Sequence, residues 1–398
     1  MVFAAITTNN LPVTTHFRKD IDTVKDGVLT IPDKDAKDAK YPQFLPTWDP
    51  SQKYPKLEPF HFVDRGFFGD PGYERLLADA DGPVDQFDLT PKLGTEIRSG
   101  IQLSTLSPEA KDDLALLVER RGVVVFRNQD FKDRSPDFVK KWGEHFGPLH
   151  IHPTTSAPKD HPELHIVYIR PDPAEIKRMF ATKMNSCLFH SDVSFELQPP
   201  GVTLYCVVQG PVTGGDTVFA DTIEAYDRLS NKMKGLLDGL KAVHSGIAVA
   251  NDSIRNGGIF RRDPVESIHP LVRYHPVLKK KALFAGNGFV TRILGLKDAE
   301  NKNLLDFISN HIESSIDIQV HVRWEPGTVV LWDNRRILHS PTVNWDTPEL
   351  RHAFRVTPQA ERPVGSEEEY ENWTPEKELE DLKEKERILS AFPDEVDI

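Results

Sequence analysis

The chain has 398 residues and a formal net charge of −12, because 49 Lys and Arg stand against 61 Asp and Glu. This acidic balance argues against general nucleic-acid binding, which favours a basic face that neutralises phosphates. No apolar run approaches the roughly 18 residues that a membrane-spanning helix needs, so no membrane span is expected. The two cysteines, Cys187 and Cys206, are too few for a disulfide framework, and the sequence predicts a cytoplasmic protein.

The first 85 residues differ from the rest of the chain in their amino-acid composition and pattern. Residues 41–60 carry five prolines and several aromatic residues with no helical or strand period. A flexible linker would be richer in Gly and Ser, so this segment is predicted to be an ordered arm that pins aromatic side chains to the core. We therefore expect residues 1–85 to form an N-terminal extension that packs on a larger domain.

From about residue 86 the pattern becomes regular. Ser107 and Pro108 predict the start of a helix that runs to about Arg121, with Ser107 as N-cap and Pro108 in the first turn. A strand is predicted over 123–126 and a second helix around 136–146. Short runs rich in β-branched and aromatic residues predict further strands at Leu164–Ile169, Val202–Gln209, Thr217–Ala220, Ile318–Val322 and Thr328–Trp332. Helical patterns cover 222–240 and 298–313.

Strands without regular βαβ alternation favour an antiparallel sheet, sandwich or barrel with helices packed outside. The predicted fold class is therefore mixed α/β, mainly antiparallel β. The acidic tail over 363–398, with the stretch Pro375–Ser390, predicts a charged surface helix. The expected organisation is an extension over 1–85, a main domain over 86–362 and a helical tail over 363–398.

Common phosphate-binding and nucleophile motifs are missing from the sequence. There is no GxGxxG that opens a βαβ unit, no Walker A loop and no GxSxG elbow. A cysteine nucleophile at Cys187 or Cys206 stays open, although no neighbouring residue supports one.

His190-Ser191-Asp192 is a short motif whose imidazole and carboxylate can bind a metal ion. In an extended segment, residues i and i+2 point to the same side. Such a pair, completed by a distant His, forms the 2-His-1-carboxylate triad that holds Fe(II) and leaves positions for a co-substrate and O2. By itself the motif is weak, because a structural His–Asp hydrogen bond is commoner. Downstream, however, a Pro-Gly turn feeds a strand that ends near His339, and Arg351 and Arg355 follow.

Several ordered blocks make the chain resemble the taurine dioxygenase (TauD) family of Fe(II)/2-oxoglutarate-dependent oxygenases, over roughly residues 86–360. The blocks lie at 93–100, 123–128, 146–153, 190–200, 214–217, 225–230, 269–273, 288–292 and 332–339. The N-terminal extension is similar to that of longer fungal members. The resemblance implies a double-stranded β-helix (jelly-roll) core with flanking helices.

The resemblance also implies a set of site residues. His190, Asp192 and His339 would be the catalytic iron ligands. Thr217 and Arg351 would hold the distal carboxylate of 2-oxoglutarate, since an Arg can grip a carboxylate bidentately. The implied co-reactants are Fe(II), 2-oxoglutarate and O2.

Substrate contacts follow from the same resemblance. The matching positions are Arg355, His152, Phe289 and Val193, with an amine-side position at Ser186 or, after a one-residue shift, Asn185. Two departures stand out, because the family's tyrosine is Thr155 here and its tryptophan is Phe189. They favour a substrate other than taurine. Val343 and Trp345 are further candidates for the pocket, and His150 with His152 leaves a separate HxH metal site open.

The implied reaction oxidises a C–H of a small anionic substrate, with succinate and CO2 as co-products. An alkylsulfonate is favoured, and its hydroxylation would release sulfite and an aldehyde. The alternative is the same chemistry on a small amino acid or other carboxylate in secondary metabolism, ending in hydroxylation, desaturation or cyclisation. A purine-type substrate and a non-catalytic jelly-roll binding protein are further, weaker alternatives. No nucleic-acid or membrane partner is expected, and homo-oligomerisation stays open.

Overall fold

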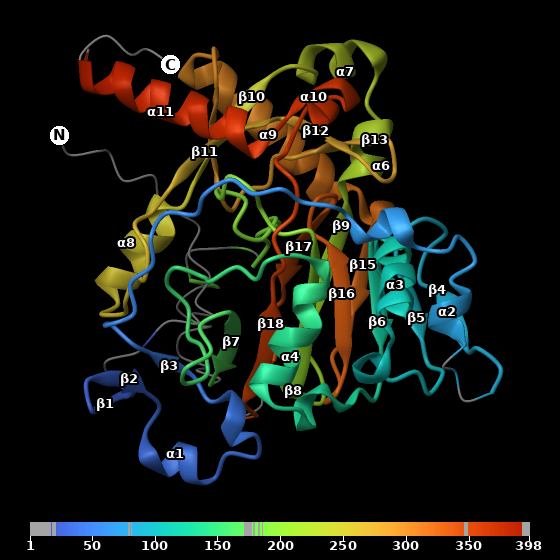
Figure 1. Ribbon diagram of the computed structural model, residues 1–398, viewed down its shortest axis with the longest axis vertical. Helices are drawn as coiled ribbons and strands as arrows, with labels where there is room; N and C mark the ends of the chain where they lie inside the picture. The colour runs from blue at the N-terminus through green and yellow to red at the C-terminus, as the bar shows by residue number, and fades with distance from the viewer. Residues whose placement is uncertain are drawn as a thin grey trace.

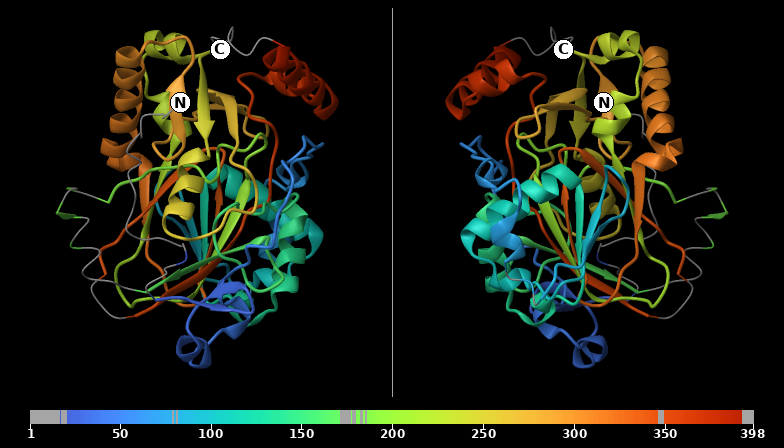
Figure 2. Two further views of the ribbon diagram at one scale, coloured as in Figure 1. Left: turned by 90° about the vertical axis from the view of Figure 1, so that its left-hand side faces the viewer. Right: turned by 90° about the vertical axis from the view of Figure 1, so that its right-hand side faces the viewer.

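The computed structural model describes residues 17, 21–78, 80, 82–170, 177, 180–181, 184, 186–345 and 349–391, with side chains to residue 383. Two β-sheets face each other at its centre, and helices cover the outside (Figure 1, Figure 2). The large sheet has, in spatial order, β4 (Gln86–Asp88), β5 (Thr95–Ile97), β6 (Val123–Phe126), β16 (Val329–Asp333), β8 (Val202–Gln209), β18 (Arg351–Val356) and β7 (Leu164–Ile169). The small sheet has β15 (Gln319–Val322), β9 (Thr217–Asp221) and β17 (Ile337–Pro341).

The remaining elements surround this pair of sheets. Three further small sheets contain β1 (Thr23–Lys25), β2 (Val28–Thr30) and β3 (Thr47–Trp48); β11 (Glu266–Pro270), β10 (Lys241–Ser245) and β14 (Val290–Ile293); and β12 (Val272–His275) with β13 (Lys280–Leu283). The helices are α1 (Asp33–Lys37), α2 (Glu74–Leu77), α3 (Pro108–Arg121), α4 (Pro136–Gly143), α6 (Thr222–Asp227), α7 (Asn231–Leu237), α8 (Ile247–Arg255), α9 (Asp298–Ser314), α10 (Glu367–Asn372) and α11 (Pro375–Ala391). Strands β5 and β6 run parallel, and the other paired strands are antiparallel. The predicted mixed, mainly antiparallel class is thus confirmed.

The helices and strands predicted for the main domain are present, with small differences at their ends. Ser107 caps α3 through a hydrogen bond from the backbone N of Ala110 to its Oγ, at 3.1 Å. The helical pattern over 222–240 is divided between two helices, α6 and α7. Ser230 starts the second one, because its Oγ accepts a hydrogen bond from the backbone N of Met233 at 3.2 Å. Such a cap favours a new helix start over a continuous helix.

The large sheet sends alternate side chains to opposite faces, as strand geometry requires. On β8, Leu204 and Cys206 join the apolar cluster on the helix side. Tyr205 and Val207 join the cluster that faces the small sheet. The protein therefore has two main layers of core around this sheet, one under the helices and one between the sheets.

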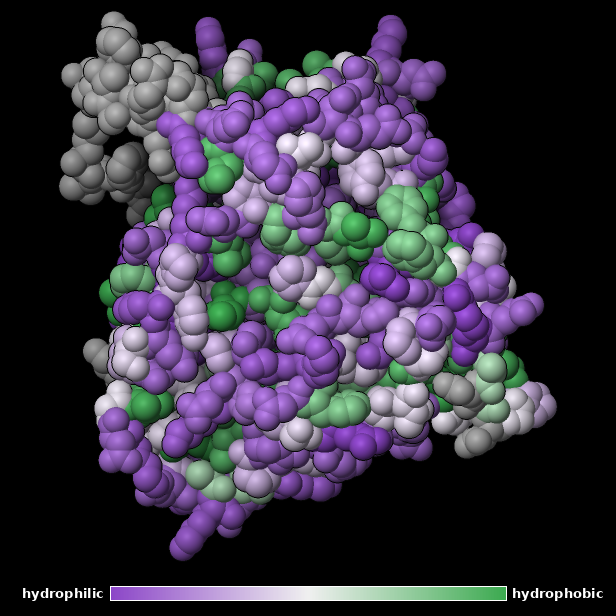
Figure 3. All heavy atoms as spheres, viewed as in Figure 1, coloured by the Kyte–Doolittle hydropathy of each residue, from purple (hydrophilic) through white to green (hydrophobic). Residues whose placement is uncertain are grey.

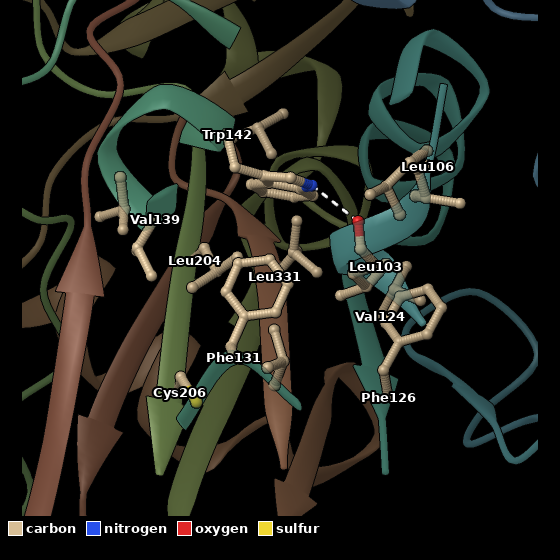
Figure 4. Close-up of a cluster of buried hydrophobic side chains, with 14 of the residues drawn as sticks. Leu103, Leu106, Val124, Phe126, Phe131, Val139, Trp142, Leu204, Cys206 and Leu331 are labelled. Carbon is tan, nitrogen blue, oxygen red and sulfur yellow. Dashed lines mark hydrogen bonds between the residues drawn. The ribbon is translucent and has the colours of Figure 1, made fainter. Parts of the chain in front are cut away.

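Aromatic packing anchors the helix-side layer. Trp142 of α4 donates its Nε1 hydrogen to the carbonyl oxygen of Leu103 at 2.7 Å, and its ring meets that of Phe131 edge-on, 5.1 Å between centroids (Figure 4). Cys206 lies in the same apolar cluster (Figure 4). The indole is thus buried without an unpaired donor, which is the condition for burying Trp at low cost.

The N-terminal extension contacts the main domain at several points. Phe44 stacks on Phe354 of β18 with 4.5 Å between ring centroids, and its carbonyl oxygen accepts a hydrogen bond from His352 Nε2 at 2.8 Å. The amide of Gln198 bonds both backbone groups of Phe60, at 2.8 and 3.1 Å. The domain boundaries at 85/86 and 362/363 stay predictions.

Asp64 of the extension enters a buried cluster of charges around Arg335. The Arg335 guanidinium contacts the carboxylates of Asp64, Glu119, Asp333 and Glu361. Burial and the neighbouring Asp64 raise the pKa of Glu119 well above its usual range. Burial alone would raise the pKa of Asp64 too, but Arg335 lowers it, so Asp64 keeps its negative charge. The extension is therefore tied to the core through an ion pair that water does not reach.

Asp64→Asn is expected to lower the free energy of unfolding by about 3 kcal/mol, the upper end for a hydrogen bond to a charged group, because it breaks the buried ion pair with Arg335 while Asp333 and Glu361 remain. For a chain of this length that corresponds to a fall in melting temperature of about 4 °C. Asp33→Asn is the matched control, since Asp33 pairs with Lys25 at an exposed position and a surface pair contributes little. Thermal melts of both variants check the prediction, and equal melting temperatures would contradict it.

The surface is mainly polar on the face drawn in Figure 3, where hydrophobic residues form small, separated patches. Within the described part of the chain, no helix combines the length and the apolar character needed to cross a bilayer.

Candidate active site

His190, Asp192 and His339 converge at β17, an edge strand of the small sheet. His339 lies in β17, and its backbone pairs with that of His190 through N–O hydrogen bonds of 2.9 and 3.1 Å. Asp192 Oδ1 lies 3.6 Å from the Nε2 atom of each histidine. One ligand atom from each of the three residues lies within 4.8 Å of the others, and no other such group occurs among the described residues.

The three side chains fit a divalent metal ion. The Nδ1 of His190 lies 2.9 Å from the carbonyl oxygen of Leu188, which fixes its hydrogen there and leaves Nε2 as a lone-pair donor. Burial lowers the pKa of His339 to about 3, so this imidazole is neutral, as a metal ligand must be. Asp192 Oδ2 is buried and has no hydrogen-bond partner in the described chain. Two imidazoles and one carboxylate are the donor set of a non-haem Fe(II) site.

Asn334 holds the Asp192 segment in place. Its Oδ1 accepts a hydrogen bond from the backbone N of Asp192 at 2.8 Å, and its Nδ2 donates to the backbone oxygen of the same residue at 3.1 Å. The next residue, Val193, has φ +40°, a left-handed conformation that is costly for a β-branched side chain. Gly288 packs directly against His190, because a Cβ at residue 288 would lie 2.6 Å from the Cβ of His190. A larger residue at this position would displace the His190 side chain.

A cavity of about 140 Å³ opens beside the triad, between the two sheets. Its lining residues are His165, Val167, Ile169, His190, Tyr205, Thr217, Phe219, Trp324, Trp332, His339, Pro341, Arg351 and Arg355. Aliphatic and aromatic side chains form most of the wall, and the two arginines bring positive charge into it. Such an apolar space with a few polar groups is typical of a small-ligand site.

Thr217 and Arg351 are both buried and line this cavity. The Nε1 of Trp324 donates to Thr217 Oγ1 at 3.1 Å, so the hydroxyl hydrogen of Thr217 remains for another acceptor. The Arg351 guanidinium lies 6.0 Å from the ring centroids of both Tyr205 and Trp345. These aromatic contacts fix the direction of the arginine while leaving its planar donors for a carboxylate.

Arg355 lines the cavity on the same side of β18 as Arg351. Its Nη1 donates to Asp192 Oδ1 at 2.6 Å. Burial alone would raise the pKa of Asp192, but the positive charge of Arg355 holds it well below its usual range. The site thus combines a metal-binding group with a fixed cation next to it.

Residues 85–357 match the family described as "Taurine catabolism dioxygenase TauD, TfdA family". The chain belongs to this family. The predicted membership and enzyme class, an alpha-ketoglutarate-dependent dioxygenase, are thereby confirmed, and TauD-family membership implies iron and 2-oxoglutarate at this site.

Three comparisons give the scale of the similarity. The alpha-ketoglutarate-dependent sulfonate dioxygenase of Saccharomyces cerevisiae is 51% identical over 88% of this chain and 85% of its own length. The alpha-ketoglutarate-dependent dioxygenase cnsM of Penicillium expansum is 41% identical over 83% of this chain and 92% of its own length. A crystal structure of a taurine dioxygenase from Burkholderia xenovorans superposes with a TM-score of 0.59, at 28% identity over 71% of this chain and 91% of that one.

The substrate residues implied by TauD-family resemblance lie around the site at different distances. Phe289 lies 6.1 Å from His190, measured between ring centroids. The ring of His152 lies 5.1 Å from that of His165, which itself lines the cavity. Val193 is buried directly after Asp192. Ser186 is half-buried, and Asn185 lies outside the described residues.

Two alternatives from the sequence find no support in the geometry. His150 lies 2.8 Å from Glu196 and not at a shared metal site with His152, whose ring is 6.1 Å away at 87°. Burial raises the pKa of Cys187 to about 11 and that of Cys206 further, so neither thiol is activated as a nucleophile. Val343 and Trp345 are buried but are not part of the cavity lining.

Sequence reasoning missed several cavity residues, and His165 is the most polar of them. It stands in the otherwise apolar strand LHIVYI, where a histidine is commonly part of the core. The alternation of side chains along the strand could have indicated it, because His165, Val167 and Ile169 share one face of β7.

Proposed function

We propose that this TauD-family dioxygenase oxidises an alkylsulfonate at the carbon next to sulfur. Fe(II) would be held by His190, Asp192 and His339, and 2-oxoglutarate by Thr217 and Arg351. The observation that carries the substrate proposal is the position of Arg355, whose guanidinium lines the same cavity as the metal-binding group. The Arg355 side chain is 11% exposed, and such a guanidinium in a mostly apolar cavity favours an anionic head on an apolar body. Identity to the yeast sulfonate dioxygenase supports the same substrate class.

When bound, Fe(II) supplies the O2 chemistry that converts 2-oxoglutarate to succinate and CO2 and inserts one oxygen atom into a substrate C–H. The residues of the chain have three tasks. Arg351 and Thr217 orient the co-substrate by its distal carboxylate, and Arg355 orients the substrate by its anion. Phe219 and Trp332, both buried against His339, keep water from the reacting atoms.

The product of this oxidation accounts for sulfite. Hydroxylation at the carbon that bears the sulfonate gives an α-hydroxysulfonate. Its C–S bond then breaks with the electron pair leaving on sulfur, the hydroxyl loses its proton, and an aldehyde and sulfite result. No further redox partner is needed for this second step.

We infer that the two facing sheets form the double-stranded β-helix (jelly-roll) that the family resemblance implies. Support comes from the antiparallel pairing of β9 with β15 and β17, and from the apolar cluster shared between this sheet and the large one. The cytoplasmic location and the oligomeric state stay predictions.

A carboxylate substrate is the second candidate. The relative cnsM from Penicillium expansum, at 41% identity, is not named for a sulfonate. Arg355 would bind a planar carboxylate as well as a sulfonate, because both offer two oxygens to a guanidinium.

Matched pairs of anions separate the two candidates. Fe(II)-loaded protein is given 2-oxoglutarate, O2 and either hexane-1-sulfonate or hexanoate, with taurine and small amino acids as further probes, and succinate and sulfite are assayed together. The proposal predicts that hexane-1-sulfonate stimulates succinate formation and releases sulfite. Stimulation by hexanoate or an amino acid alone, with no sulfite, would assign the enzyme to carboxylate substrates instead.

A further inference from the structure

His165 and Arg355 face each other across two strands. They are direct partners in the antiparallel register of β7 and β18. Side chains of such a pair lie on the same face of the sheet, with their Cβ atoms about 5 Å apart. Both line the cavity beside His190 and His339. The pairing therefore fixes His165 next to the arginine whatever the loops around the site do.

The three nitrogens of the Arg355 guanidinium differ in their hydrogen-bond partners. Nη1 donates to Asp192 Oδ1, Nη2 donates to His165 Nδ1, and Nε is buried with no hydrogen-bond partner in the described chain. Two side chains thus hold the guanidinium from two directions and leave the Nε hydrogen and one hydrogen on each Nη for other acceptors. Without the His165 contact, the group would keep only the Asp192 contact and could rotate about it.

Neighbouring residues argue against a purely packing role for His165. Leu164 and Ile166, on the other face of β7, belong to the apolar cluster under the helices, whereas His165 points between the sheets. The ring of His152 lies 5.1 Å away. Arg355, His165 and His152 therefore form one polar corner in a cavity whose other walls are mainly apolar.

We propose that His165 is a positioning residue that sets the direction of Arg355 and thereby the affinity of the site for the anionic head of the substrate. This inference rests on the proposed function, because it takes Arg355 as the anion-binding group. It extends to any small molecule with a terminal oxyanion, sulfonate or carboxylate.

The test compares three variants by their KM for hexane-1-sulfonate and for 2-oxoglutarate. His165→Ala is expected to raise the KM for the sulfonate about tenfold, the effect of losing a hydrogen bond to a charged group, while the KM for 2-oxoglutarate changes less than about twofold. His165→Asn keeps an acceptor near the Nδ1 position and should restore most of the affinity. Tyr168→Phe, on the opposite face of β7 and outside the cavity lining, controls for changes to the strand and should not produce the selective rise.

The outcomes separate the two proposals. If wild type accepts hexanoate but not hexane-1-sulfonate, the sulfonate proposal fails. The role of His165 is then tested by comparing the KM for hexanoate with the KM for 2-oxoglutarate. A His165→Ala variant whose KM for the accepted anion stays within twofold of wild type would overturn the role of His165. So would equal rises in both KM values, or no recovery in His165→Asn. A wild type that accepts none of the sulfonates and carboxylates tested would contradict both proposals.

Discussion

His190→Ala and Asp192→Ala are expected to reduce succinate formation to background while the fold is retained. Each variant removes one of the three groups whose ligand atoms lie within 4.8 Å of one another. The loss should exceed the 10- to 100-fold that removal of an outer hydrogen-bond partner typically costs a metal site. Succinate formation and iron content of the purified protein measure the effect.

His321→Ala is the matched control for these variants. His321 lies in β15 of the small sheet, but its side chain is 55% exposed and lies outside the cavity lining. We expect this variant to keep wild-type turnover and iron content, and circular dichroism to give the same fold for all three. Full turnover by His190→Ala or Asp192→Ala would rule out the proposed iron site.

Arg355→Ala is expected to raise mainly the KM for the anionic substrate, and Arg351→Ala mainly the KM for 2-oxoglutarate. Loss of Arg355 should raise the KM for the anionic substrate by about 10- to 100-fold, as expected for hydrogen bonds to a charged group, and affect that for 2-oxoglutarate far less. Loss of Arg351 should raise the KM for 2-oxoglutarate instead. The two arginines lie four residues apart on one strand and line one cavity, so each is a control for the other.

Steady-state kinetics with each substrate varied in turn measures the split. Because Arg355 also donates to Asp192, iron content is determined for both variants, and kinetics are compared at saturating Fe(II). Equal effects of Arg355→Ala on both KM values would mean that Arg355 is not the arginine that binds the substrate.

The metal-binding group was predictable from a local motif together with the resemblance to the family. His190 and Asp192 are two residues apart, and a Pro-Gly turn and a buried strand precede His339. Arg351 and Arg355 share a face because residues i and i+4 align on a strand, which β18 confirms. These residues needed only spacing and the resemblance to the family.

The rest of the site depends on pairing between distant segments. His165 reaches the cavity only because β7 pairs with β18 in one register, and 190 residues separate it from Arg355. Asn334 and Asp192 are 142 residues apart, so no local pattern indicates their hydrogen bonds. A one-residue shift in strand register would turn His165 away from the cavity, and a single sequence does not specify that register.

The ratio of sulfite to succinate tests the central claim most directly. Wild-type protein with Fe(II), 2-oxoglutarate and O2 is supplied with hexane-1-sulfonate, and both products are measured over the same time course. Oxidation at the carbon next to sulfur, coupled to decarboxylation at this site, predicts equimolar sulfite and succinate that both disappear in Asp192→Ala. Substrate-stimulated succinate without sulfite, or sulfite that persists in Asp192→Ala, would contradict it.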